Sequence, residues 1–250
     1  MTVPRLDATI SPDFQLARNA SFWEPEAECT VVMSQPSIDR GLWHEFLRGA
    51  ERSYRRHGVE RVLDVAAIRG GEDTSLFWAI LDTAGRVVGG LRAKGPLNFA
   101  DESHAVIEWA GQPGILRVRK MITDRLPFGV IEMKSAWVAD DVDRKHLLTN
   151  IVARLPLHST AVLRTQFSVA TAASHVTARW VASGGVVASR IPATAYPDDR
   201  YRTKVMWWDR HTYANSAEPK QASKTVVEIM ALHQQLDELY EVAAPQVSPV

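Results

Sequence analysis

The chain has 250 residues, 46% hydrophobic and 23% charged, a composition that predicts one globular domain with a sizeable core. Its 29 basic and 29 acidic residues give a formal net charge of zero, which excludes a global field attracting nucleic acid or an anionic membrane. The single cysteine, Cys29, excludes an internal disulfide and thiolate zinc sites. Because the sequence shows neither a secretion signal nor a run of about 20 apolar residues, a cytoplasmic protein without a membrane span is expected.

The first half of the chain predicts one helix and several strands. The first 40 residues hold four prolines among residues of mixed polarity, which favours an N-terminal arm. Gly58 is placed to end the first helix, and Gly85 can take the positive φ of a hairpin turn. The segment 95–114 gives no assignable element. In chain order the predicted elements are a strand at 30–33, a helix over 41–57, a hairpin of strands 76–81 and 86–92, and strands over 115–122 and 129–138.

The second half of the chain alternates helices with strands and ends in a helix. An acidic cluster at 140–143 favours a helix start, a glycine pair at 184–185 favours a helix end, and Thr225 and Glu228 have capping-box spacing. The last helix packs on the parent domain in the simplest interpretation, with a homodimer contact as the alternative. In chain order the predicted elements are a helix over 143–155, a strand over 161–170, a helix over 174–183, strands over 186–191 and 202–209, and a helix over 223–242.

Three segments resemble the acyl-homoserine lactone (autoinducer) synthases and the N-acyl amino acid synthases, which share the acyltransferase fold called GNAT. Residues 85–92 read Gly-Arg-Val-Val-Gly-Gly-Leu-Arg. They are similar to the returning hairpin strand of these enzymes, which leads through glycine to an inward-pointing arginine. Residues 130–138 look like the central strand, with a glutamate shortly before a polar or basic residue. Residues 169–185 resemble the strand, small-residue turn and helix that close the GNAT core.

The resemblance implies an α/β (α+β) fold of GNAT type, with a central twisted mixed sheet and flanking helices. It implies an N-terminal arm over 1–40, an acyltransferase domain over 41–212, and a C-terminal helix and tail over 213–250. The implied reaction moves an acyl group from a carrier thioester, acyl-coenzyme A or acyl-carrier protein, to the amine of an amino acid or related small molecule. No metal is expected, because the histidine and carboxylate spacings form no metal-binding constellation.

Acyl transfer to an amine needs a base, donors for the oxyanion and a proton for the leaving thiolate. Glu132 is the expected base, because burial in an otherwise apolar strand raises the pKa of a carboxylate; pairing with an arginine is the alternative interpretation. The usual tyrosine acid of the family has Trp180 or Val181 in its place. Tyr196 is therefore the expected catalytic substitute, with Tyr201 as the alternative.

The acceptor is expected to meet residues of the hairpin and the central strand. Arg92 is the candidate to bind its carboxylate in bidentate fashion, with a structural ion pair as the alternative. Ser135 stands where the family often has a basic residue. Trp137 can form an apolar wall, although core packing is the alternative for most of the eight tryptophans.

The donor is expected along the main chain at Val138 and Ala139 and in the loop that follows. Arg144 and Lys145 would attract its phosphate, and His175 would contact it or simply lie at a polar helix N-terminus. The loop contains no glycine and several aspartates, which disfavours close approach of a pyrophosphate. Two alternatives therefore stay open: an N-acetyltransferase that uses acetyl-coenzyme A, and a catalytically inactive GNAT-like binding or regulatory module.

Overall fold

The computed structural model describes residues 14–243, with side chains described through residue 237. In this part of the chain eight strands form one sheet, in the order β1-β2-β3-β4-β5-β6-β8-β7. All neighbouring strands are antiparallel except β5 and β6, so the sheet is mixed. The strands are β1 (Ala20–Glu24), β2 (Cys29–Ser34), β3 (Leu76–Leu81), β4 (Val87–Lys94), β5 (Val130–Val138), β6 (Phe167–Ala173), β7 (Val186–Val187) and β8 (Thr203–Asp209). The helices are α1 (Arg40–Arg56), α2 (Val65–Ile68), α3 (His104–Glu108), α4 (Ile115–Thr123), α5 (Lys145–Val162), α6 (Thr177–Ala182) and α7 (Pro219–Ala243).

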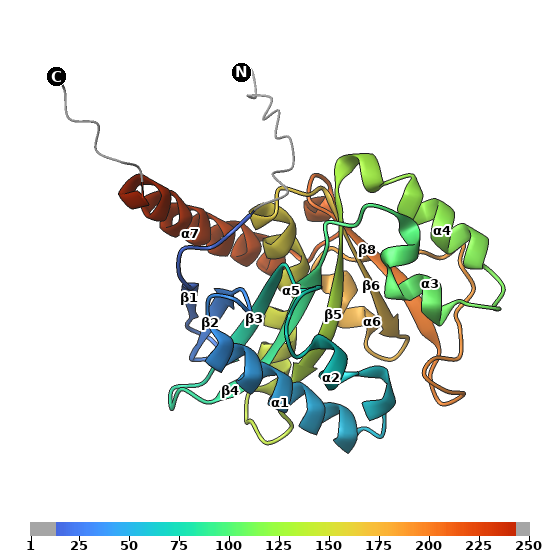
Figure 1. Cartoon of the computed structure of the whole chain (residues 1–250), viewed down its shortest axis with the longest axis horizontal. Coiled ribbons are helices and arrows are strands. Elements are labelled where there is room, and N and C mark those ends of the chain that lie inside the picture. Colours follow the sequence, from blue (N-terminus) through green and yellow to red (C-terminus); the bar gives the residue numbers. More distant parts are fainter. Residues whose placement is uncertain (1–13, 244–250) are drawn as a thin grey trace.

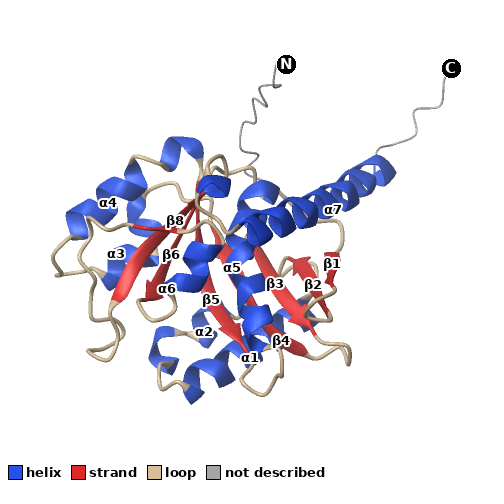
Figure 2. Cartoon of the chain, turned by 180° about the vertical axis from the view of Figure 1, so that it is seen from behind, coloured by secondary structure: helices blue, strands red, loops and turns tan. Residues whose placement is uncertain are grey.

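Helices cover both faces of the sheet and produce three layers, seen from the two sides in Figures 1 and 2. On one face α1 packs on β3, β4 and β5 around Trp43, Phe46 and Phe77. Beside it, α3 and α4 enclose a second apolar cluster that contains Trp109 and Trp207. On the opposite face α5 packs on β3 to β6 and is buried over most of its length. The predicted fold class, a central sheet with flanking helices and a further C-terminal helix, is confirmed.

Most of the predicted elements are present, but the segment 115–122 is helix α4 instead of a strand. Its buried residues Val118 and Ile122 are four positions apart, a spacing that places them on one face of a helix. The strand prediction rested on the apolar character of this segment and overlooked its helical period. The error matters for the site, because α4 supports the short helix α3.

Helix α5 is longer than predicted, since it runs through Pro156 to Val162. The strand predicted from residue 161 therefore begins only at Phe167. A proline inside a helix costs about 3 kcal/mol. Every residue from Ile151 to Val162 is buried, so tertiary packing outweighs this local penalty. The final strand pair is also shorter than predicted, with β7 limited to Val186–Val187.

The residues predicted as an N-terminal arm contribute β1 and β2 to one edge of the sheet, and the strand predicted at 30–33 lies within β2. The outer edge of β1 is closed by Gln235 of α7. The Gln235 side-chain amide accepts a hydrogen bond from Ser21 N (3.0 Å) and donates one to Ser21 O (2.7 Å). An edge strand satisfied in this way offers fewer free groups for pairing with another chain.

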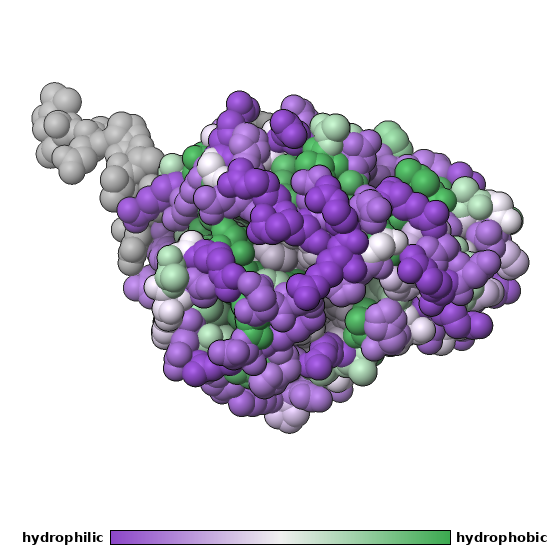
Figure 3. All heavy atoms as spheres, turned by 90° about the horizontal axis from the view of Figure 1, so that it is seen from below, coloured by the Kyte–Doolittle hydropathy of each residue, from purple (hydrophilic) through white to green (hydrophobic). Residues whose placement is uncertain are grey.

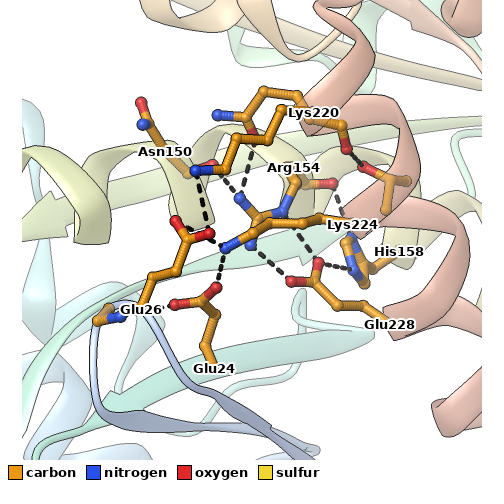
Figure 4. Close-up of polar contacts among 11 residues, drawn as sticks. Glu24, Glu26, Asn150, Arg154, His158, Lys220, Lys224 and Glu228 are labelled. Carbon is orange, nitrogen blue, oxygen red and sulfur yellow. Dashed lines mark hydrogen bonds and ion pairs between the residues drawn. The ribbon is translucent and has the colours of Figure 1, made fainter.

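Helix α7 begins at Pro219, where a proline suits the first helical turn, and it projects beyond the sheet (Figure 1). Glu228, predicted in a capping box with Thr225, lies inside the helix instead. Its carboxylate meets Arg154 of α5 in bidentate fashion, at 2.6 Å (Nη2–Oε1) and 2.9 Å (Nε–Oε2). The same carboxylate lies 2.9 Å from His158 Nε2 (Figure 4). These buried contacts fix α7 on α5.

Candidate active site

The centre of the sheet opens between the parallel strands β5 and β6. Their pairing covers three residue pairs, from Val130↔Phe167 to Glu132↔Val169, and β5 then continues to Val138 without further pairing to β6. A bulge lies just beyond this point, because Ser135 has φ +54° and the register of β5 on β4 shifts by one residue there. Bulges bend the strand that carries them. The strands therefore separate immediately after Glu132 and leave a wedge at their C-terminal ends.

The wedge leads into a cavity of about 440 Å³. Its walls come from both splayed strands, the C-terminal end of α1, α3, the first turns of α5, the start of α6 and the connection before β8. Figure 3 views the molecule from the side on which these strand ends lie, where hydrophilic side chains surround small apolar areas. A pocket with mainly apolar walls and a few polar side chains is typical of a small-molecule site. The polar side chains among its walls therefore define the chemistry.

Glu108, at the end of α3, is the carboxylate of this cavity. Its side chain is 3% exposed, and Oε1 accepts a hydrogen bond from Thr171 Oγ1 of β6 at 2.9 Å. Oε2 has no hydrogen-bond partner among the described residues. Burial raises the pKa of Glu108 to about 7, although Lys134 Nζ lies 3.8 Å away and opposes the shift. A carboxylate with a free oxygen and a pKa near neutrality has the properties of a general base.

Glu132, the predicted base, has a different environment. Its carboxylate accepts three hydrogen bonds, from Ser103 Oγ (3.0 Å), His104 N (2.9 Å) and Ala105 N (3.1 Å). These donors form the N-terminus of α3, and Glu132 does not line the cavity. An anion at a helix N-terminus satisfies the free N–H groups of the first turn. Glu132 thus holds α3 in place, and α3 in turn presents Glu108.

His104 and Tyr196 lie beside Glu108 on the same wall. His104 and Glu108 are separated by four positions on α3 and so share one face of the helix. His104 Nε2 lies 2.9 Å from the Tyr196 hydroxyl and 3.7 Å from Glu108 Oε1. Burial lowers the pKa of His104 to about 4 and raises the pKa of Tyr196 to about 12. At neutral pH the imidazole is therefore neutral and the phenol keeps its proton.

Of the predicted acceptor contacts, Ser135 and Trp137 line the cavity and Arg92 does not. The Arg92 guanidinium is buried in contacts with Asp73 (2.8 Å), the Thr74 hydroxyl (3.1 Å) and the Ser135 hydroxyl (3.3 Å). Arg92 thus forms a structural ion pair with Asp73 and a hydrogen bond to Ser135 at the bulge. Lys134, whose backbone pairs with that of Arg92, lines the cavity.

Of the predicted donor contacts, Val138, Lys145 and His175 line the cavity. Ala139 N donates to Val88 O at 2.8 Å, so the alternation of an antiparallel ladder turns the Val138 N–H to the other edge of β5, toward the wedge. Arg144 lies outside the cavity, where it pairs with Glu28 at 3.0 Å.

Two of the three aspartates in the β5–α5 loop pair with basic side chains. Asp140 pairs with Lys145 and with Arg56, and Asp141 pairs with Arg86 at 2.7 Å. The hydrogen bond from Lys145 lowers the pKa of Asp140 below its usual range. The loop therefore repels a phosphate less strongly than its sequence indicates.

Sequence reasoning missed Glu108, His104 and Thr171. Glu108 and His104 lie in the segment 95–114, for which the sequence predicted no element. Their spacing of four residues was the available sign that they share one face of a helix. Thr171 lies in a strand of small residues and carries no local signal at all.

Two further kinds of feature are absent from the described residues. Residues 14–243 contain no helix long and apolar enough to cross a membrane. The same residues hold no group of three or more histidine, cysteine, aspartate or glutamate side chains that could bind a metal ion.

The chain is similar in sequence to one group of proteins and in structure to others. No protein-family model matches the chain. An uncharacterized protein of Mycobacterium tuberculosis is 52% identical over 240 residues, which cover 96% of this chain and 91% of the relative. The acyl-homoserine lactone synthase LasI has a similar structure, with a TM-score of 0.50, 10% identity and coverage of 74% of this chain and 91% of LasI. FeeM, an N-acyl amino acid synthase from uncultured soil microbes, has a TM-score of 0.47, 9% identity and coverage of 80% and 93%. The chain thus belongs to the same family as the mycobacterial protein and has the GNAT fold.

Proposed function

We propose that this protein is an N-acyltransferase that moves an acyl group from a carrier thioester, acyl-coenzyme A or acyl-carrier protein, to the amine of an amino acid or related small molecule. The observation that carries the proposal is the buried Glu108 carboxylate, whose Oε2 has no hydrogen-bond partner among residues 14–237 and which lines the wedge between β5 and β6. The fold shared with LasI supports it.

Glu108 acts as the general base in this proposal. The carboxylate accepts a proton from the amine while the amine nitrogen attacks the thioester carbonyl. A base is most effective when its pKa lies near the working pH, and burial brings the pKa of Glu108 to about 7. Glu132, which is saturated by three donors at the N-terminus of α3, is a positioning residue for this base.

The edge of β5 supplies the oxyanion site. The Val138 N–H is directed into the wedge, and a main-chain donor fixed by a strand needs no reorganisation when charge develops on the carbonyl oxygen. Lys145 and the N-terminus of α5 lie at the same end of the cavity and attract the phosphate of the donor. His175 of the β6–α6 turn is at its rim.

The acyl group is assigned to the apolar side of the cavity below α5 and α6. Val152, Ala172, Val176 and Trp180 line this side and carry no charge. The acceptor occupies the opposite side, where Lys134 and Glu108 provide a cation for a carboxylate and a base for an amine. Ser135 and Trp137 line the passage between the two sides.

The test is expression of the protein in a bacterial host and mass spectrometry of the extract for new N-acyl amides. We expect new amides with the wild type and with Glu45→Gln, an exposed control on α1. The Glu108→Gln variant is expected to lose them, by a factor of about 10² to 10⁴ in rate. Equal yields from Glu108→Gln and the wild type would reject Glu108 as the base. Absence of amides together with absence of acyl-coenzyme A binding in calorimetry would instead indicate an inactive module.

A further inference from the structure

Three protonatable groups lie in series on one wall of the cavity, with one hydrogen bond and one longer gap between them. The same nitrogen of His104, Nε2, faces both the Tyr196 hydroxyl at 2.9 Å and Glu108 Oε1 at 3.7 Å. The rings of His104 and Tyr196 meet edge to face, with centroids 5.9 Å apart. A proton that reaches Nε2 from one side can therefore leave to the other side without a flip of the imidazole ring.

We propose that His104 relays the proton that Glu108 removes from the amine to Tyr196, and that Tyr196 delivers a proton to the departing thiolate. The inference rests on the proposed acyl transfer and assigns a role to His104 beyond it. His104 is a positioning residue in this scheme, because it acts through Glu108 and Tyr196. It touches neither the acceptor nor the donor.

The proton balance of the relay closes within the site. Glu108 gains one proton as the amine nitrogen bonds to the carbonyl carbon. Collapse of the tetrahedral intermediate breaks the carbon–sulfur bond, and the sulfur departs with the bonding electron pair. Tyr196 gives its hydroxyl proton to that sulfur, and His104 passes the proton of Glu108 to the phenolate. The carboxylate, imidazole and phenol end in their starting states, with one N–H exchanged for one S–H.

The surroundings keep this chain of groups fixed and the imidazole neutral. The backbone N–H of His104 donates to the Glu132 carboxylate, and the Thr171 hydroxyl donates to Oε1 of Glu108. Burial is the largest cause of the lowered pKa of His104; the cations Lys134, Lys94 and Arg92 lower it further, and Glu132 opposes them. Glu108, whose Oε1 lies 3.7 Å from Nε2, is a second anion that faces the ring. A neutral imidazole at neutral pH has the free lone pair that a relay requires.

The test distinguishes a defect in protonation of the leaving group from a defect in folding or in substrate binding. Purified wild type, Tyr196→Phe, His104→Gln and Glu108→Gln are assayed for N-acyl amide formation with two octanoyl thioesters, of coenzyme A and of 4-nitrothiophenol. A mixture of all proteinogenic amino acids serves as acceptor. The nitrothiophenolate is a weak base and leaves without a proton, whereas the coenzyme A thiolate is basic and benefits from one. Each variant is compared with the wild type on the same donor.

We expect Tyr196→Phe and His104→Gln to lose about 10²-fold or more in rate with octanoyl-coenzyme A and to approach the wild-type rate with the nitrothiophenyl ester. Glu108→Gln is expected to lose activity with both donors. Equal losses on both donors for Tyr196→Phe and His104→Gln would overturn the relay, because a structural defect affects both thioesters alike. A wild type that transfers octanoyl from neither donor would count against the proposed function itself.

Discussion

Thr171 of β6 and Glu108 of α3 are joined by a hydrogen bond of 2.9 Å, in which the threonine hydroxyl donates to carboxylate Oε1. The bond connects the strand on one side of the wedge to the helix that carries the proposed base. It also lowers the pKa of Glu108 against the larger effect of burial. Thr171→Val removes this donor, so the pKa of Glu108 is expected to rise and the pH midpoint of activity to move upward. Thr171→Ser keeps the hydroxyl and serves as the control; an unshifted midpoint in Thr171→Val would contradict the assignment.

The wild-type protein is expected to gain acyl-transfer activity as the pH rises through about 7, because the proposed base Glu108 accepts a proton only when it is ionised and burial raises its pKa to that value. His104 stays neutral and Tyr196 stays protonated over this range, since their pKa values are shifted to about 4 and about 12. The measurement is kcat/KM for amide formation as a function of pH. A profile that is flat across neutral pH in the wild type would speak against Glu108.

Glu132 and Glu108 are expected to respond differently to substitution. Glu132→Ala removes the acceptor of three hydrogen bonds at the N-terminus of α3 and should cost about 1 to 3 kcal/mol of unfolding free energy, with loss of activity as α3 moves. Glu108→Gln keeps the size of the side chain and should lose activity without comparable loss of stability. Urea denaturation followed by circular dichroism measures both. Full stability of Glu132→Ala with lost activity would restore Glu132 as the base.

Gly49 lets α1 approach the sheet at Trp137. A Cβ added at Gly49 would lie 2.1 Å from two atoms of the Trp137 ring, a contact that cannot exist without movement of the helix or the ring. Gly49→Ala is therefore expected to lower the unfolding free energy by about 1 to 3 kcal/mol. The matched control is Gly41→Ala in the same helix, where the nearest atom is 3.5 Å away and alanine is tolerated. Thermal unfolding of the two variants compares them; equal midpoints would contradict the packing.

The ion pair between Arg154 and Glu228 anchors α7 (Figure 4). Glu228→Ala leaves the Arg154 guanidinium buried without its anion, for which a loss of about 3 to 5 kcal/mol is expected. Glu51→Ala, which removes an exposed pair with Arg55 on α1, should change stability by less than about 1 kcal/mol. Urea unfolding free energies test the difference. Similar losses for both variants would show that the buried pair contributes no more than a surface one.

Most strands of the sheet could be predicted from the sequence because they show a local pattern, but β1 (Ala20–Glu24) was not predicted. The apolar spacing of α1 and the hairpin of β3 and β4 with Gly85 at its turn are contained in a few neighbouring residues. Where local pattern and packing disagreed, packing won. Pro156 lies inside α5 because this part of the helix is buried by the surrounding structure. The residues next to Pro156 in the sequence do not predict this burial.

The resemblance to GNAT enzymes, read from the segments 85–92, 130–138 and 169–185, also came from the sequence and led to the region of the sheet where the cavity lies. It placed the wedge beside Val138 and pointed to Tyr196, Ser135 and Trp137, all of which line the cavity. It could not show that two of the loop aspartates, Asp140 and Asp141, pair with Arg56, Arg86 and Lys145 from other elements.

The sequence by itself determined the fold class and the strand on which the site is built, because hydrophobic periodicity and turn residues act over short distances. Only the tertiary structure decided which glutamate faces the cavity. Glu132 and Glu108 are both buried, and each has apolar neighbours in the sequence, so the local sequence does not distinguish the two residues. The distinction arises because Glu132 meets three N–H and O–H donors at the start of α3, whereas the docked helix carries Glu108 into the wedge and leaves one of its oxygens free.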